Sequence, residues 1–407
     1  MVYNRAMTLP HPPAVSLAPS ARIAQIPPYF YAHLTRRLAQ LKAAGVDVIR
    51  MDAGSPDLPP APFIVEALEQ SARNPNHHGY MPYGGLPEYR AAWAEFYGRR
   101  FGVELDAQTE IVGLIGSKEG VFNLSLAYVD PGDVVLVPDP GYAPYTAGAR
   151  FAGGEVVYMP LLAANRNRYL PDFRAIPDDV LRRTKIMWLN YPNNPTGAVA
   201  PIELFVEAAQ LAREYGFIVA HDAPYTEITF DGYRAPSLLQ APGAKEVGIE
   251  FHSLSKTYNM GGWRVGVACG NAEVIQTLAT LKSNIDSGVF RGIQDAAVAA
   301  LTGDQAWITA RNEHYRRRRD LVVAAVRAIG LEADVPAAAL YVWARLPQGV
   351  DDADYASRLL EATGVSLTPG SVFGPSGRGY LRLSLCLPDA RLNEAMERVK
   401  QFEFRRT

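Results

Sequence analysis

Residues 185–222 read KIMWLNYPNNPTGAVAPIELFVEAAQLAREYGFIVAHD, and this stretch contains a strand–helix–strand unit. The apolar runs at 185–190 and 217–222 have the length of buried strands, whereas 202–215 carries apolar residues at the spacing of a helix face. Two apolar strands joined by a helix are typical of a parallel sheet with helices on its faces. The stretch therefore predicts an α/β fold.

The same alternation extends on both sides of this unit. Further strands are expected at 110–115, 133–137, 155–159, 249–254 and 265–270, with helices at 118–129 and 273–282. We therefore expect a large domain over 50–290, built around a mostly parallel seven-stranded sheet.

The pattern changes after residue 290. Helices are expected within 292–329 and at 352–363 and 389–404, with strands at 338–344 and 380–385. This segment, 291–407, predicts a smaller α+β domain. Residues 1–49, an N-terminal arm followed by a helix at 29–44, are expected to belong with it.

Composition excludes several classes of protein. The chain has 407 residues and a formal net charge of −2, so no basic field attracts nucleic acid or anionic lipid. No apolar run approaches the roughly 18 residues that span a bilayer, the N-terminus has no apolar core of a signal peptide, and two cysteines suggest no disulfide framework. A cytoplasmic protein is expected, and Arg316–Arg319 is interpreted as a solvated helix face.

Polar residues follow the strands at the point where each one ends. They are Gly116-Ser117-Lys118, Asp139-Pro140-Gly141-Tyr142, Asn190–Gly197, Asp222-Ala223-Pro224-Tyr225 and Ser253-Leu254-Ser255-Lys256. Ligands of open α/β sheets bind outside the carboxyl ends of the strands. These groups therefore predict one site at one edge of the sheet.

The sequence gives little support to two other kinds of site, one for a nucleotide and one for a metal. Gly113–Lys118 matches neither the Rossmann nor the P-loop spacing of glycines, which leaves a glycine turn opening a helix whose N–H groups at Ser117 and Lys118 favour a phosphate. His77, His78 and His221 lack partners at metal-ligand spacing, so no metal site is expected.

The segment SLSKTYNMGGWR at 253–264 resembles the lysine signature of class I and II aminotransferases, which are fold type I pyridoxal-phosphate enzymes. NNPTG at 193–197, DAPY at 222–225 and YLRLS at 380–384 match other landmarks of that family, in its order. The resemblance implies pyridoxal 5′-phosphate as cofactor and transfer of an amino group between an amino acid and a 2-oxo acid.

The resemblance also assigns the residues that hold the cofactor. Lys256 would form the Schiff base and later move the Cα proton, and Asp222 would pair with the pyridine nitrogen. Tyr225 and Asn194 would donate to the 3′ oxygen, and Tyr142 would stack on the ring. The phosphate would be held by the side chains of Ser253, Ser255 and Arg264 and by the backbone of Ser117 and Lys118.

Further residues are implied for the substrate and for a second subunit. Arg382 would bind the substrate α-carboxylate, with Gly54 and Asn194 beside it. Tyr80 resembles the tyrosine that reaches the phosphate from a partner subunit, which implies a homodimer with shared active sites. Arg291 could bind a distal carboxylate or simply begin a helix in solvent.

The amino acid that serves as substrate stays open at this level. Residues 26–31, 54–59 and 283–290 resemble the branch of LL-diaminopimelate and aspartate/alanine aminotransferases. A carbon–sulfur β-lyase of the same fold would share Lys256, Asp222 and Arg382. A non-catalytic effector module fused to a DNA-binding domain is disfavoured, since the residues before position 50 contain no basic recognition helix.

Overall fold

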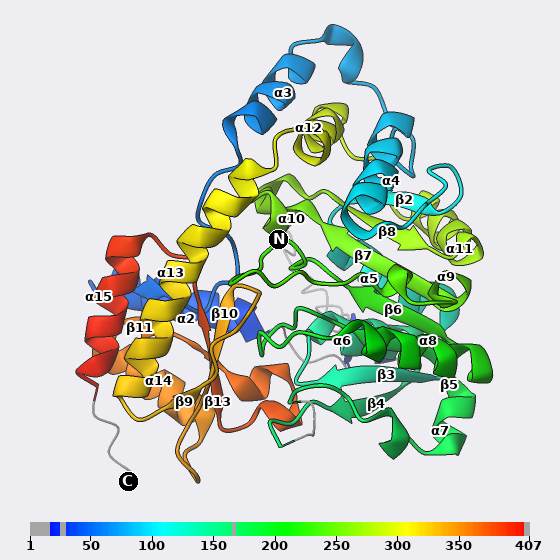
Figure 1. Ribbon diagram of the computed structural model, residues 1–407. Helices are drawn as coiled ribbons and strands as arrows, with labels where there is room; N and C mark the ends of the chain where they lie inside the picture. Colours follow the sequence, from blue (N-terminus) through cyan, green and yellow to red (C-terminus); the bar gives the residue numbers. More distant parts are fainter. Residues whose placement is uncertain (1–16, 25–29, 165–167, 403–407) are drawn as a thin grey trace, which may run out of the picture.

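The computed structural model describes residues 17–24, 30–164 and 168–402 of the chain (Figure 1). All seven expected strands form, within a residue or two of their expected limits, and they pair in the order β2-β8-β7-β6-β5-β3-β4. Their bounds are β2 Ile111–Leu114, β3 Val134–Asp139, β4 Glu155–Pro160, β5 Thr184–Leu189, β6 Ile218–Asp222, β7 Gly248–Ser253 and β8 Gly266–Gly270.

The mostly parallel sheet is confirmed, with one strand running the other way. β8 is antiparallel to both of its neighbours, β2 and β7, and the remaining pairs are parallel. The parallel strands are joined by helices because a parallel crossover needs a long connection. The carboxyl ends of β3, β5, β6 and β7 consequently meet at one edge of the sheet.

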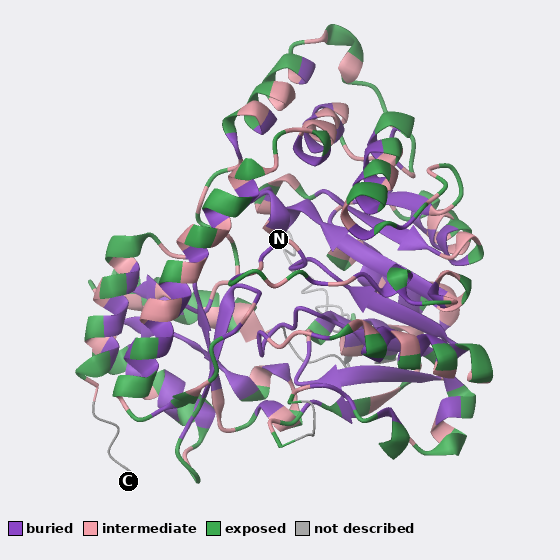
Figure 2. Cartoon of the chain, in the orientation of Figure 1, coloured by how far each residue is buried: buried purple, intermediate pink, exposed green. Residues whose placement is uncertain are grey.

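Helices cover both faces of this sheet, which is buried throughout its centre (Figure 2). α5 (Ser117–Tyr128), α6 (Ala143–Ala152) and α11 (Ala272–Ser283) pack on one face, where Ile218 and Ala220 of β6 also point. α8 (Ile202–Tyr215) packs on the other face, against Val219 of the same strand. Successive side chains of β6 therefore face opposite layers.

A second sheet of four antiparallel strands lies apart from the large one, at the lower left of Figure 1. Its order is β12-β13-β10-β9, with β12 Thr368–Pro369, β13 Tyr380–Ser384, β10 Tyr341–Arg345 and β9 Glu332–Ala333. Beside it, β1 (Ile49–Arg50) pairs in parallel with β11 (Val365–Ser366). The N-terminal segment is thereby joined to the C-terminal part of the chain.

The remaining helices complete the two regions. They are α1 Ala21–Ala24, α2 Phe30–Ala43, α3 Pro62–Ala72, α4 Pro87–Phe101, α7 Asp178–Arg183, α9 Ala244–Val247, α10 Leu254–Thr257, α12 Arg291–Thr302, α13 Ala306–Ala328, α14 Asp352–Thr363 and α15 Asp389–Lys400. The last helix ends at Lys400, short of the expected limit at residue 404, which itself lies outside the described residues. α12 packs against α3 and α4, and the division at residues 49 and 290 stays a prediction.

Half of the basic run on α13 departs from the solvated face that the sequence suggested: Arg317 is exposed and Arg316 is partly exposed, whereas the next two arginines are buried. Arg318 and Arg319 are buried at 4% and 3% exposure. Arg318 pairs with Asp57 and Asp389, and Arg319 pairs with Asp231. Buried arginines are tolerated when carboxylates neutralise them, and these partners are remote in sequence.

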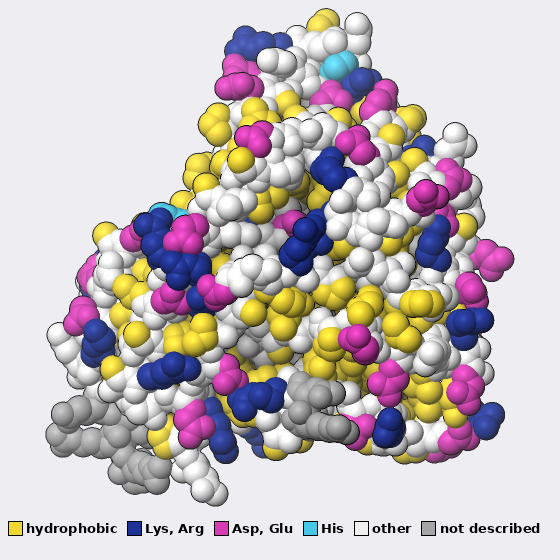
Figure 3. Space-filling view, viewed as in Figure 1, with side chains coloured by type: hydrophobic (Ala, Val, Ile, Leu, Met, Phe, Trp, Pro, Cys, Tyr) yellow, Lys and Arg dark blue, Asp and Glu magenta, His cyan; other side chains and the backbone are white. Residues whose placement is uncertain are grey.

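Elsewhere the surface is mixed in charge. Basic and acidic side chains intermingle on the face shown in Figure 3, and no large area of one sign stands out there. No helix among the described residues is long and apolar enough to cross a membrane. Within the same residues, no group of three or more His, Cys, Asp and Glu side chains could hold a metal ion.

Candidate active site

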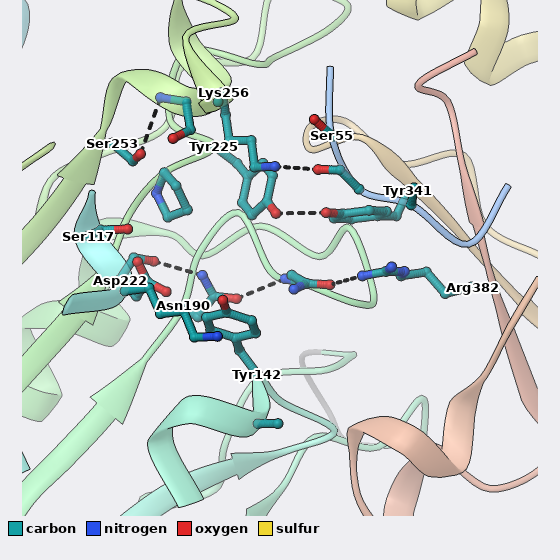
Figure 4. A pocket seen from close by; sticks show the side chains of 18 of the residues that line it. Ser55, Ser117, Tyr142, Asn190, Asp222, Tyr225, Ser253, Lys256, Tyr341 and Arg382 are labelled. Carbon is teal, nitrogen blue, oxygen red and sulfur yellow. Dashed lines mark hydrogen bonds between the residues drawn. The ribbon is translucent and has the colours of Figure 1, made fainter. Parts of the chain in front are cut away.

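A cavity of about 400 Å³ lies at the carboxyl edge of the large sheet, between that sheet and β10 and β13 of the small one. Thirteen residues were assigned from the sequence to the cofactor or to the substrate α-carboxylate, and twelve of them line this cavity (Figure 4). They are Gly54, Ser117, Lys118, Tyr142, Asn194, Asp222, Tyr225, Ser253, Ser255, Lys256, Arg264 and Arg382. Tyr80 is the exception. The structure thus gathers segments that span most of the sequence.

Asp222 ends β6 on the face covered by α5 and α6. The Tyr145 hydroxyl donates to its Oδ2 at 2.7 Å, whereas its buried Oδ1 has no hydrogen-bond partner in the structure. Burial raises the pKa of this carboxyl to about 6, and the bond from Tyr145 opposes that rise. A buried anionic oxygen without a donor is costly. The protonated pyridine nitrogen of pyridoxal phosphate would supply the missing N–H.

Lys256 lies on α10, the short helix that follows β7. Its ammonium group donates to the Gly54 carbonyl oxygen. Burial lowers the pKa of Lys256 to about 8, and the positive charges of Arg382 and Arg264 add to this effect, against an opposing influence of Cys386. An amine with a lowered pKa is a better nucleophile and proton acceptor near neutrality.

The phosphate end of the site is built from the turn before α5 and the loop after α10. Gly116 precedes α5 with a φ of +74°, and a Cβ there would come within 2.1 Å of the Arg264 guanidinium. Glycine is therefore required for the arginine to reach the helix N-terminus. Arg264 donates to the Ser255 hydroxyl at 3.3 Å, so donors and positive charge converge where an anion would bind.

Two further polar groups stand in this part of the cavity. The Ser253 hydroxyl accepts from the Ser255 N–H at 3.2 Å and caps α10. Burial lowers the pKa of Lys118, and the nearby Arg264 lowers it further. This repulsion indicates that the two cations share one end of the site, which is the arrangement that a doubly charged phosphate would stabilise.

Arg382 stands at the opposite end, on β13. It is buried at 3% exposure, and its guanidinium donates to Asn194 Oδ1 at 2.8 Å, to the Tyr31 hydroxyl at 2.8 Å and to the Asp52 carbonyl oxygen at 2.7 Å. Its carbon also lies 4.2 Å from the centre of the Tyr341 ring. None of these partners is a carboxylate, so the buried charge remains available to an anionic ligand.

Asparagine and tyrosine side chains connect the two ends of the cavity. Asn190 donates to the Asp222 carbonyl oxygen at 2.7 Å and accepts from the Asn194 N–H at 2.8 Å. The hydroxyls of Tyr225 and Tyr341 are 2.8 Å apart, and burial raises the pKa of Tyr225 well above its ordinary value. Tyr225 therefore stays protonated and able to donate a hydrogen bond.

Tyr80 is 93% exposed and lies away from the cavity. Its assignment to a partner subunit stays a prediction. Arg291 is also outside the cavity, where its guanidinium lies 3.5 Å from Asp295. His221, expected to be structural, is buried and contacts Glu250 at 2.7 Å.

Among the residues of the site that were not assigned from the sequence, five make polar contacts or carry charge there: Tyr31, Arg50, Tyr145, Asn190 and Tyr341. All except Tyr145 line the cavity, and Tyr145 contacts Asp222 from behind it. Asn190 stands inside a motif and could have been assigned from its place at the end of a strand. The other four carry no local signal, because each meets its partner only across the folded chain.

The comparisons with known proteins agree with this geometry. The family model for aminotransferase class I and II matches residues 46–399. An LL-diaminopimelate aminotransferase from Moorella thermoacetica is 51% identical, over 93% of this chain and 97% of its own length. One from Desulforudis audaxviator is 52% identical, over 95% of this chain and 98% of its own.

Solved structures show the same fold. Substrate-bound BacF from Bacillus subtilis superimposes with a TM-score of 0.91 at 36% identity, covering 95% of this chain and 98% of its own. The aspartate aminotransferase from Thermus thermophilus with maleate gives a TM-score of 0.87 at 34% identity, covering 94% and 99%. The expected fold type I architecture is thereby confirmed, and nothing in the comparisons supports the β-lyase. The chain belongs to the class I and II aminotransferases and is a pyridoxal-phosphate-dependent transaminase.

Proposed function

We propose that this aminotransferase takes LL-diaminopimelate as amino donor and passes the amino group to a 2-oxo acid such as 2-oxoglutarate. The observation that carries the proposal is the name borne by relatives about half identical to this chain over nearly their whole length. The cavity is compatible with such a substrate, since five of its lining side chains are basic and only Asp222 is acidic. An amino acid with two carboxylates suits that balance.

When bound, pyridoxal phosphate supplies an electron sink that stabilises negative charge at the Cα of the amino acid. Asp222 would keep the pyridine nitrogen protonated through its unpaired Oδ1. Tyr225 and Asn194 would donate to the 3′ oxygen, and Tyr142 would stack on the ring. Arg264, Ser253, Ser255 and the N–H groups of Ser117 and Lys118, which line the same cavity, would hold the phosphate.

Lys256 would act on the substrate as well as on the cofactor. Once free, its Nζ stands in the same cavity as the Arg382 guanidinium, which would bind the α-carboxylate by a bidentate pair of hydrogen bonds. The lowered pKa of Lys256, about 8, leaves a useful fraction of neutral amine near pH 7–8. That amine can accept the Cα proton at Nζ and return it elsewhere.

We also propose a cytoplasmic homodimer. Support comes from Tyr80, whose 93% exposed ring lies on a segment in contact with the loop before α12, where Pro82 and Met81 carbonyl oxygens approach Gly288. An exposed tyrosine in this position suits a role in a neighbouring subunit's phosphate site.

The test is a half-reaction panel on the purified holoenzyme. LL-diaminopimelate, glutamate, aspartate and alanine are each added alone, and the cofactor absorbance is followed. We expect LL-diaminopimelate to convert the cofactor to its amine form with the highest kcat/KM, and 2-oxoglutarate to restore it.

Two outcomes would contradict the proposal. Fast conversion by alanine or aspartate with none by LL-diaminopimelate would show a different donor. Release of pyruvate and ammonia from cystathionine, without the shuttle between the two cofactor forms, would show lyase chemistry.

A further inference from the structure

The cavity contains more positive charge than the cofactor and one carboxylate require. Its basic side chains are Arg50, Lys118, Lys256, Arg264 and Arg382. Lys256 is the residue for the cofactor aldehyde, and Arg264 with Lys118 stands at the phosphate end. Arg382 is the buried arginine for the α-carboxylate. Arg50 alone has no ligand in this assignment.

Arg50 ends β1, on the same side of the cavity as Arg382. The Tyr31 hydroxyl accepts a hydrogen bond from Arg382 at 2.8 Å. The pKa of Arg50 is raised chiefly by its hydrogen bond with Asp52, and interaction with Tyr31 adds to that rise. Asp52 links the two arginines directly, because its carboxylate accepts from Arg50 and its carbonyl oxygen accepts from Arg382, so Arg50 lies at the substrate end of the cavity.

The guanidinium of Arg50 is fixed by one carboxylate and leaves its other edge open. Its Nε donates to Asp52 Oδ1 at 3.3 Å, and its Nη2 donates to Oδ2 at 2.6 Å. Asp52 is fully buried, whereas the Arg50 side chain is 37% exposed. Among the described residues, Nη1 makes no hydrogen bond. The edge formed by Nη1 and the second Nη2 hydrogen can thus donate two hydrogen bonds to another carboxylate.

We propose that Arg50 is a specificity-determining residue that binds the distal carboxylate of a dicarboxylic amino donor. The proposal rests on the proposed function, since LL-diaminopimelate carries a carboxylate at each end of its carbon chain. Asp52 serves as the positioning residue: its bidentate pair holds the guanidinium plane, and its own carbonyl oxygen accepts from Arg382 at 2.7 Å. The backbone at Asp52 thereby ties the two arginines together.

A second cavity offers the competing location. It measures about 890 Å³, shares Lys118, Tyr142, Ala143, Val372 and Phe373 with the active-site cavity, and is also lined by Arg150 and Arg378. Arg150 is exposed, and it forms no ion pair with any of the described residues. Arg150 provides a matched control, because it is an arginine in a neighbouring cavity that shares residues with the active site.

The experiment compares two unreactive ligands that differ only in the distal group. Pimelate has the seven-carbon chain with two carboxylates, and heptanoate has the same chain with one. Their dissociation constants are measured by calorimetry on the holoenzyme for wild type, Arg50→Gln, Arg50→Lys and Arg150→Gln. A thermal melt of each variant establishes that it is folded.

We expect wild type to prefer pimelate, and Arg50→Gln to reduce that preference about tenfold, the effect of one charge-assisted hydrogen-bonded pair. Heptanoate binding should change little, whereas a purely structural role of Arg50 would weaken both ligands through Asp52 and Arg382. Arg50→Lys should give an intermediate preference, since it keeps the charge and loses the fork. Arg150→Gln should match wild type.

An unchanged pimelate preference in Arg50→Gln would overturn the proposal, as would its loss in Arg150→Gln. If Arg50→Gln does not fold, Arg50→Lys decides by the same criterion. These outcomes are separate from the half-reaction panel, because unreactive ligands report the second carboxylate site whether or not LL-diaminopimelate is the donor.

Discussion

Asp222 and Glu250 are two buried carboxylates on adjacent strands, and they differ in the number of hydrogen bonds that their oxygens accept. Asp222 Oδ1 has no partner, and burial raises the pKa of this residue to about 6. Glu250 accepts from Tyr97, Ser237, the Leu238 N–H and two histidines. Burial alone would raise the pKa of Glu250 too, but its hydrogen bonds with His221 and His252 bring it below the ordinary value.

The two residues also face opposite layers, since the neighbour of Asp222 in β6 is His221, the partner of Glu250. A fully satisfied buried carboxylate stabilises the fold. One left with a free oxygen costs stability until a ligand arrives. The contrast teaches that, for these two carboxylates, a missing hydrogen-bond donor rather than burial as such distinguishes the site from the structural core.

The largest expected effect is on catalysis at Asp222. Asp222→Asn removes the negative charge that would hold the pyridine nitrogen protonated, so kcat/KM for the amino-acid half-reaction should fall on the order of 10³-fold. Stopped-flow absorbance measures it, with Glu250→Gln as the matched control. A loss equally large in folded Glu250→Gln would erase the contrast between the two carboxylates.

Glu250→Gln should instead act on stability. It leaves His221 and His252 without their shared carboxylate and should lower the free energy of unfolding by about 3–5 kcal/mol, measured by urea titration. The depressed pKa of Glu250 gives stability that is present above its unfolded value of 4.5 and is lost as the pH falls below it. The variant should therefore lose less stability than wild type on acidification. A variant as stable as wild type would contradict the structural role.

Asp222→Asn should have the opposite effect on cofactor-free protein. The pKa of Asp222 is raised from 3.8 to about 6 in the folded protein, so its ionised carboxylate destabilises the fold. This destabilisation is absent below pH 3.8, grows as the pH rises and is complete above about pH 6. The neutral side chain should therefore stabilise the cofactor-free protein at pH 8 by on the order of 2–3 kcal/mol, and hardly at all at pH 4. Denaturant curves at both pH values check this sign, and destabilisation at pH 8 would refute it.

The smallest expected effect is at Tyr145, whose ring stacks on Trp188 with centroids 4.8 Å apart. Tyr145→Phe keeps the stacking and removes the hydrogen bond to Asp222, so kcat/KM should fall about fivefold to tenfold, the effect of one hydrogen bond that contributes roughly 1–1.4 kcal/mol. In the cofactor-free protein the pKa of Asp222 should also rise, so the destabilising effect of the ionised carboxylate should be complete only at a higher pH. A pH profile identical to wild type would show that Tyr145 has no influence on the carboxyl.

Much of this protein was determined by local sequence. Strand and helix periods located the seven strands of the large sheet, because alternation of apolar runs and amphipathic helices is a property of short segments. The residues that follow each strand, Asp222 and Lys256 among them, could be assigned to one edge since parallel strands end together. The motifs then identified the cofactor.

Tertiary structure alone decided the rest. Arg382 meets Tyr31 across 351 positions, Tyr145 meets Asp222 across 77, and buried Arg318 meets Asp57 across 261. Sequence periodicity does not predict such pairs, because a tyrosine or arginine in a helix has the same neighbours in sequence whether its side chain faces solvent or a carboxylate. Arg50 shows the limit most clearly: it is an ordinary strand residue in the sequence, and only the folded structure places it in the same cavity as Arg382.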